Sequence, residues 1–210
     1  MRMSLSTYIA HQFAHPTGMI GQIIMTVSNR QNRKLYNKTI DLLNVTKNDT
    51  ILDIGFGNGF MLRQIAELKP EKLFGVDISE DMLHVAQRKN ALQIKSRKME
   101  LLLANAENLP FKNDFFDKIY TVNTVYFWND FEKTVAEIRR VLKHNGVFLN
   151  TFYERAVLER LHHSSNDIYR KFTTKELKNR TEQGGFSEVK MLEIEKGIFS
   201  CIFAKNNKIW

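Results

Sequence analysis

From position 50 onward, short hydrophobic runs alternate with amphipathic stretches. The hydrophobic runs predict buried strands at 51–54, 73–77, 100–104, 118–122 and 147–152. Between several of them, apolar residues recur at helical spacing and predict helices at 61–68, 80–92 and 130–142. Strands that alternate with helices of this length are typical of βαβ units, so we expect a parallel sheet.

The last forty residues break this alternation. A helix predicted near 173–183 ends at Gly184-Gly185, and two strand-like runs at 187–195 and 198–205 are separated only by Lys196-Gly197. Two strands joined by so short a turn form a hairpin. We therefore predict an α/β, Rossmann-like fold with a seven-stranded, mostly parallel sheet and an antiparallel C-terminal hairpin.

The N-terminal segment is unusual because no charged residue occurs between Arg2 and Arg30. Polar residues, Pro16 and glycines interrupt every apolar run, which excludes a signal peptide and a membrane span. After the break at 16–18, one apolar stripe has helical spacing and consists of Ile20, Ile23, Ile24 and Val27. We expect this uncharged, mostly apolar segment to pack on the main domain, with residues 1–44 as a helical lid over a ligand site and 45–210 as the main domain.

Composition indicates an ordinary globular chain. Its 210 residues are 43% hydrophobic and 26% charged, enough apolar surface for a core without disulfides or metals. The lone cysteine, Cys201, lies in a predicted strand, so we expect it in the core; it excludes a disulfide framework or a cysteine-based metal site. A single cysteine also favours a reducing compartment, and we expect a cytoplasmic protein.

The formal net charge is +8, from 31 Lys and Arg against 23 Asp and Glu. Such an excess favours anionic partners, or it is spread over solvated helix faces. The densest basic run, at 88–98, contains no aromatic residue that could stack on bases. We therefore interpret the charge as dispersed and do not expect nucleic acid as the partner.

A glycine-rich turn follows the first predicted strand and precedes a helix: Asp53-Ile54-Gly55-Phe56-Gly57-Asn58-Gly59. Glycines let a ligand approach the backbone, and a helix N-terminus offers free N–H groups. Asp77 ends the next strand, 20 residues after Gly57, where an acid suits ribose hydroxyls. A dinucleotide site requires G-x-G-x-x-G, but Phe60 occupies the last glycine position, which disfavours a dinucleotide-dependent oxidoreductase.

Further segments in the same order strengthen one resemblance. The glycine-rich turn has the spacing G-x-G-x-G, with an acid two residues before the first glycine. Residues 105–111 are similar to the pattern D-A-E-x-L-P-F, and residues 137–146 are similar to the pattern E-x-x-R-V-L-K-P-G-G. Residues 116–119 and 172–186 also match. Together these segments resemble the class I S-adenosylmethionine-dependent methyltransferases, most of all the small-molecule branch that includes quinone-ring methylases.

The resemblance implies S-adenosyl-L-methionine as cofactor and gives roles to individual residues. Asp53 would orient the methionine amino end, while Gly55, Phe56 and Gly57 pass close to it. Asp77 would hold the ribose, with Ile78 against the adenine ring. Asn105 and Ala106 would contact the adenine edge. Asn105 replaces the usual Asp, so it keeps an acceptor oxygen but loses a charge.

The segment after the fourth predicted strand offers candidates for the acceptor. Asn123 would face the methionine or the transferred methyl group, or else cap the strand. Tyr126 and Phe127, followed by Trp128, would form an aromatic wall for substrate, or else pack in the core. Asn123 and Tyr126 match the ends of the N-P-P-Y motif of nucleic-acid methylases, but both prolines are missing.

The resulting hypothesis is methyl transfer to a small-molecule acceptor by in-line displacement, with no residue identified as catalytic. Nucleic-acid methylation, dinucleotide-dependent oxidation and binding without catalysis are the alternatives. His11 and His15 could share a helix face, but no third ligand is spaced with them, so we expect no metal. His162 and His163 are expected to be exposed.

Overall fold

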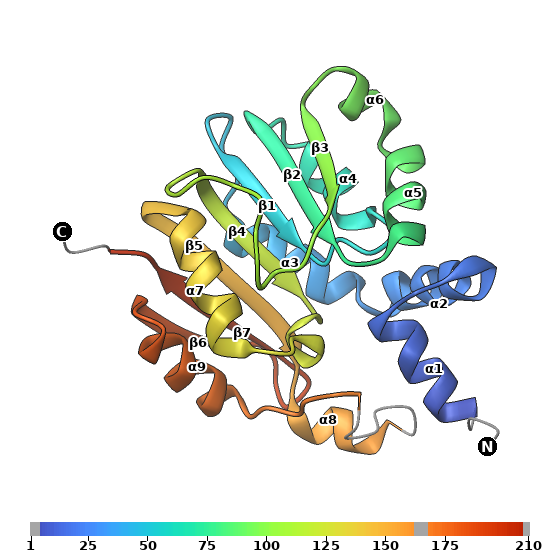
Figure 1. Cartoon of the computed structure of the whole chain (residues 1–210). Coiled ribbons are helices and arrows are strands. Elements are labelled where there is room, and N and C mark those ends of the chain that lie inside the picture. The colour runs from blue at the N-terminus through green and yellow to red at the C-terminus, as the bar shows by residue number, and fades with distance from the viewer. Residues whose placement is uncertain (1–4, 162–167, 208–210) are drawn as a thin grey trace.

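The computed structural model describes residues 5–161 and 168–207 (Figure 1). The expectation for His162 and His163 therefore lies outside the described residues. The strands are β1 (Thr50–Ile54), β2 (Lys72–Asp77), β3 (Met99–Leu103), β4 (Phe116–Val122), β5 (Leu142–Tyr153), β6 (Ser187–Glu195) and β7 (Phe199–Lys205). The helices are α1 (Leu5–Ala14), α2 (Gly18–Gln31), α3 (Arg33–Leu43), α4 (Phe60–Ala66), α5 (Glu80–Lys89), α6 (Ala91–Lys95), α7 (Phe131–Val141), α8 (Arg155–Arg160) and α9 (Thr174–Gln183).

The strands form one seven-stranded sheet in the order β3-β2-β1-β4-β5-β7-β6. β1 to β5 run parallel, whereas β7 pairs antiparallel with both β5 and β6. The predicted Rossmann-like, mixed sheet with its C-terminal hairpin is thus confirmed. β5 begins earlier than predicted, at Leu142, with a register irregularity opposite β4. Asn145 there adopts a left-handed φ of 62°, which Asn tolerates better than most residues.

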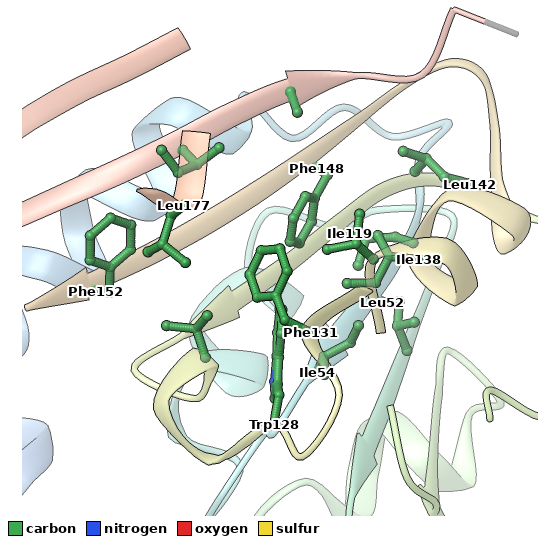
Figure 2. Close-up of a cluster of buried hydrophobic side chains, with 14 of the residues drawn as sticks. Leu52, Ile54, Ile119, Trp128, Phe131, Ile138, Leu142, Phe148, Phe152 and Leu177 are labelled. Atoms are coloured by element: carbon green, nitrogen blue, oxygen red, sulfur yellow. The ribbon is translucent and has the colours of Figure 1, made fainter. Parts of the chain in front are cut away.

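Helices cover both faces of the sheet, and side chains alternate between two clusters. Leu52 and Ile54 of β1 belong to the cluster under α7 and α9, where Phe131 and Leu177 are fully buried (Figure 2). Ile51 points to the other face, where α3, α4 and α5 pack. This alternation leaves the carboxyl ends of the parallel strands to form a site.

The helix predicted at 80–92 is interrupted at Asn90, between α5 and α6. Asn90 is fully buried, and its Nδ2 donates to the carbonyl oxygens of Gly59 (3.2 Å) and Ala86 (2.9 Å). The side chain therefore fastens the end of α5 to the glycine-rich turn. The helical periodicity of the sequence does not reveal this interruption at Asn90, because Gly59, to which Asn90 donates, lies 31 residues away.

α1 and α2 lie beyond one end of the sheet (Figure 1). The N-terminal segment contacts the main domain, for example through the Asn29–Asn58 hydrogen bond, but the stripe does not carry this contact: Ile20, Ile23 and Val27 are 50%, 59% and 53% exposed. The helix instead turns Gly21 toward α1, where a Cβ would come within 2.9 Å of Gln12 and Pro16. Among the described residues, no helix is long and apolar enough to cross a membrane.

Candidate functional site

The glycine-rich turn leaves β1 with three residues in left-handed backbone conformations. Gly55, Gly57 and Gly59 have φ values of 78°, 53° and 72°. The N–H of Gly55 donates to the carbonyl oxygen of Val76 (2.8 Å), which joins the ends of β1 and β2. A Cβ on Gly55 would overlap Cγ2 of Thr124. Only glycine fits both the backbone conformation and this space.

We expect Gly55→Ala to lower the free energy of unfolding by about 2–4 kcal/mol, because the left-handed conformation and the clash both oppose the new methyl group. Thr124→Ser provides the matched background, since it removes Cγ2 but retains the hydroxyl that contacts Thr121. Urea unfolding of both single variants and the double variant measures the effect. A loss of equal size in both backgrounds would show that Thr124 does not limit the space.

Asp77 links the glycine-rich turn to the start of α5. Its Oδ2 accepts from the N–H of Gly57 (2.8 Å) and its Oδ1 from the N–H of Ser79 (2.9 Å). Burial raises the pKa of this carboxyl, and the hydrogen bonds from Ser79 and Gly57 oppose the rise. Each oxygen has a second lone pair, so the side chain can also accept from ligand hydroxyls in the cavity that it lines.

Asp53 and Phe56 lie behind the wall of this cavity instead of lining it. Asp53 is 2% exposed, and its Oδ2 accepts from the hydroxyl of Tyr120 on β4 (2.6 Å). Burial raises the pKa of Asp53 to about 8, although the Tyr120 hydrogen bond opposes the rise. Phe56 packs in the cluster between the sheet and α4. Their contact with cofactor therefore stays a prediction.

The raised pKa of Asp53 makes stability depend on pH. Between about pH 4 and pH 8 the folded protein keeps this proton while the unfolded chain has released it. The unfolding free energy therefore falls with rising pH in that window, by at most about 1.4 kcal/mol per pH unit from this group. We expect Asp53→Asn, which cannot ionise, to gain stability relative to the native chain from pH 4 to 8. Parallel pH profiles in urea unfolding would contradict this.

Residues 104–107 form the next part of the wall, after β3. The N–H of Ala104 donates to the carbonyl oxygen of Asp77 (3.0 Å), and Oδ1 of Asn105 accepts from the N–H of Glu107 (2.9 Å). Asn105, Ala106 and Ile78 all line the cavity. Asn105 uses one of its two oxygen lone pairs within this turn, which leaves one acceptor and two donor hydrogens for a ligand.

Aromatic side chains close the other end of the cavity. Phe127 stands edge-on to Tyr169, with ring centroids 4.8 Å apart, and Tyr126 lies 5.8 Å from Tyr169. Trp128 also lines the cavity, while its ring is 5.6 Å from that of Phe131 in the core. The aromatic wall expected after the fourth strand is therefore present.

Asn123 connects this wall to the sheet. Its N–H donates to the carbonyl oxygen of Thr151 (2.9 Å), and its Oδ1 accepts from the Tyr126 hydroxyl (3.1 Å). Burial holds the pKa of Tyr126 well above its ordinary value, so this phenol is no proton acceptor at neutral pH. Tyr126 instead fixes the orientation of the Asn123 amide at the cavity.

Sequence reasoning missed the residues that come from distant segments. Met25 of α2, Phe13, Asn32, Tyr153 and Tyr169 also line the cavity. The hydroxyl of Tyr153 donates to Oδ1 of Asn32 (2.7 Å), across 121 residues of sequence. Met25 lies on the opposite side of α2 from the apolar stripe, so hydrophobic spacing alone did not identify it as a lining residue.

The cavity has a volume of about 250 Å³ and a lining that contrasts with the basic chain. Apart from tyrosines, its ionisable lining groups among the described residues are the carboxylates of Asp77 and Glu107; no Lys, Arg or His lines it. A cavity with two carboxylates and no described cation suits a cationic or neutral ligand.

The remaining candidates do not join this site. Within residues 5–161 and 168–207 no group of three potential metal ligands occurs, and His11 and His15 are exposed. Cys201 is fully buried in β7, where burial raises the pKa of its thiol. Cys201 therefore belongs to the core, as expected.

Comparisons with known proteins identify the family to which the chain belongs. Residues 52–150 match the family described as a methyltransferase domain. An uncharacterized methyltransferase of Bacillus subtilis, YdaC, is 37% identical over 131 residues, which are 61% of this chain and 67% of YdaC. A demethylmenaquinone methyltransferase of Bacteroides fragilis is 30% identical over 67% of this chain and 58% of its own length. A tRNA U34 carboxymethyltransferase of Campylobacter jejuni is 30% identical over 77% of this chain and 57% of its own.

A solved structure agrees on the fold. A SAM-dependent methyltransferase from Aquifex aeolicus superposes with a TM-score of 0.71 over 88% of this chain and 97% of its own, at 19% identity. The chain belongs to the class I S-adenosylmethionine-dependent methyltransferases.

Proposed function

We propose that the enzyme transfers a methyl group from S-adenosylmethionine to a small, largely apolar acceptor, with both molecules held in the one cavity. The observation that carries this proposal is the lining of the cavity. The residues that the resemblance assigns to the cofactor and the aromatic residues after β4 line the same cavity. Gly55, Gly57 and Asp77 stand at one side, and Tyr126 and Phe127 at the other.

The residues present fit the cofactor. A Cβ on Gly57 would come within 2.8 Å of the Met25 methyl carbon, so only glycine lets the turn approach this flexible side chain, which lines the same cavity. Asp77 offers lone pairs to ribose hydroxyls, and Ile78, Asn105 and Ala106 would enclose the adenine. Asp53 lies behind the turn, from where it would orient the amino end of the methionine. Asn123 would face the methionine.

When bound, S-adenosylmethionine supplies an activated methyl group on a positively charged sulfur. The protein's part in such a displacement is to align the acceptor and exclude water. Tyr126 is held protonated, and the Glu107 carboxylate accepts from the N–H of Asp130 (3.1 Å). Glu107 keeps further lone pairs with which its carboxylate could take a proton from the acceptor.

The acceptor class follows from the charge of the site. The names of the relatives include both a demethylmenaquinone methyltransferase and a tRNA carboxymethyltransferase. In this chain, the basic run at 88–98 lies around α6, which leads into the start of β3, whereas the cavity lies at the carboxyl ends of the strands. A nucleic acid needs cations beside its phosphates. The cavity supplies none among the described residues, so we favour a small-molecule acceptor.

We also propose that α1 and α2 form a lid in a cytoplasmic enzyme. The Ser79 hydroxyl donates to the carbonyl oxygen of Pro16 (2.8 Å), and Nδ2 of Asn29 donates to Oδ1 of Asn58 (3.1 Å). These bonds fasten the two helices to the turns after β2 and β1. Within the segment 1–44, α3 packs Leu43 and Tyr36 into the core and would remain fixed.

Two measurements test the proposed function. S-adenosylhomocysteine should raise the melting temperature of the protein, and NAD should not. Fluorescence anisotropy with labelled duplex DNA and structured RNA should show dissociation constants no tighter than about 10 μM near physiological salt. Stabilisation by NAD alone would favour an oxidoreductase, and a submicromolar, steeply salt-dependent affinity for RNA would replace the small-molecule acceptor by a nucleic acid.

A further inference from the structure

We propose that α2 docks this enzyme on an anionic membrane surface. The outward side of the helix carries Ile20, Ile23 and Val27, each at least half exposed. They follow one another at helical spacing over a helix of 14 residues, so they form a single apolar stripe. The opposite side is occupied by the contacts that hold the helix in place, including the Asn29–Asn58 hydrogen bond.

The charged residues near the stripe indicate which class of partner it binds. Arg30, Arg33 and Lys34 follow the stripe in the sequence, and the acidic side chains that the structure places beside this segment include Glu195 and Asp81, which accepts from the N–H of Gly18 at the first residue of α2 (2.9 Å). Arg30 and Arg33 are exposed, and Lys34 pairs with Glu195 (3.0 Å). A helix that lies in the plane of a membrane combines an apolar face with adjacent basic residues, which attract anionic lipids.

Other occupants fit this surface less well. A second copy would bring Arg30 and Arg33 against the same basic residues, and three half-exposed side chains supply little of the roughly 800 Å² per partner that a stable interface buries. A nucleic acid would meet an aliphatic stripe without stacking aromatics. A lipid surface satisfies both the apolar and the basic side chains.

Flotation of the full-length protein with vesicles tests the docking. Vesicles of phosphatidylcholine with phosphatidylglycerol should bind the protein, less so at high salt, and pure phosphatidylcholine vesicles should bind it weakly. The double substitution Ile23→Asn and Val27→Asn should weaken binding about tenfold or more, because polar amides do not enter the lipid interface. Leu68→Asn is the matched control: Leu68 is 44% exposed after α4, between one acidic and one basic residue, Glu67 and Lys69, and its loss should change nothing.

The outcomes separate this inference from the proposed function, on which it does not rest. Binding of S-adenosylhomocysteine should be the same in the Ile23/Val27 variant and the native chain, which shows that the fold is intact. Equal flotation of the stripe variant and the Leu68 variant would overturn the proposal, as would no flotation of the native chain. A native dimer that the stripe substitutions convert to monomer, measured by light scattering, would assign the stripe to a second copy instead.

Discussion

Replacing Asp77 by alanine should weaken the binding of S-adenosylhomocysteine about ten- to a hundredfold. The carboxylate lies at the end of β2 and would accept charge-assisted hydrogen bonds from the ribose, which together contribute about 1.5–3 kcal/mol. The same oxygens also accept from the N–H groups of Gly57 and Ser79, so the substitution also frees two backbone donors of the turn. Calorimetric titration gives the dissociation constant.

The effect on binding must be separated from the effect on the turn. Asp77→Asn keeps the shape and one acceptor oxygen but loses the charge, so it should lie between the alanine variant and the native chain in affinity. Urea unfolding of both variants measures the effect on the turn, because the two freed backbone donors would lower the free energy of unfolding whether or not cofactor is bound. An unchanged dissociation constant in a folded alanine variant would remove Asp77 from the cofactor site.

The parts of the molecule that the sequence predicts well depend on local patterns. The β1 run is short, apolar and followed by glycines. The three glycines of the turn, Gly55, Gly57 and Gly59, have the left-handed conformations that such a turn requires. Asp77 could be placed beside Gly57 because parallel strands bring their carboxyl ends together at one edge of the sheet. Their hydrogen bond is 2.8 Å long in the structure.

The parts that the sequence does not predict depend on contacts between distant segments. The periodicity of α2 identified an apolar stripe but did not show which side of the helix faces the main domain, because the inward side is chosen by Gly21, Met25 and Asn29 through close approach and one amide hydrogen bond. Tyr169 likewise enters the aromatic wall from a segment without strand or helix pattern. Hydrophobic burial is non-directional, so it could not decide either case.

Deleting residues 1–15 should lower turnover about a hundredfold or more while the remaining chain still unfolds cooperatively. The sheet keeps helices on both faces, because α3, α4 and α5 pack on one side and α7 and α9 on the other. The cavity, however, loses Phe13 and the support of α1 for α2, so water enters and the acceptor is poorly aligned. Gly21→Val is the point variant for the same effect, since its Cβ would meet Gln12 and Pro16. Full activity of the truncated enzyme would refute a role for the lid, and loss of cooperative unfolding would make α1 part of the core.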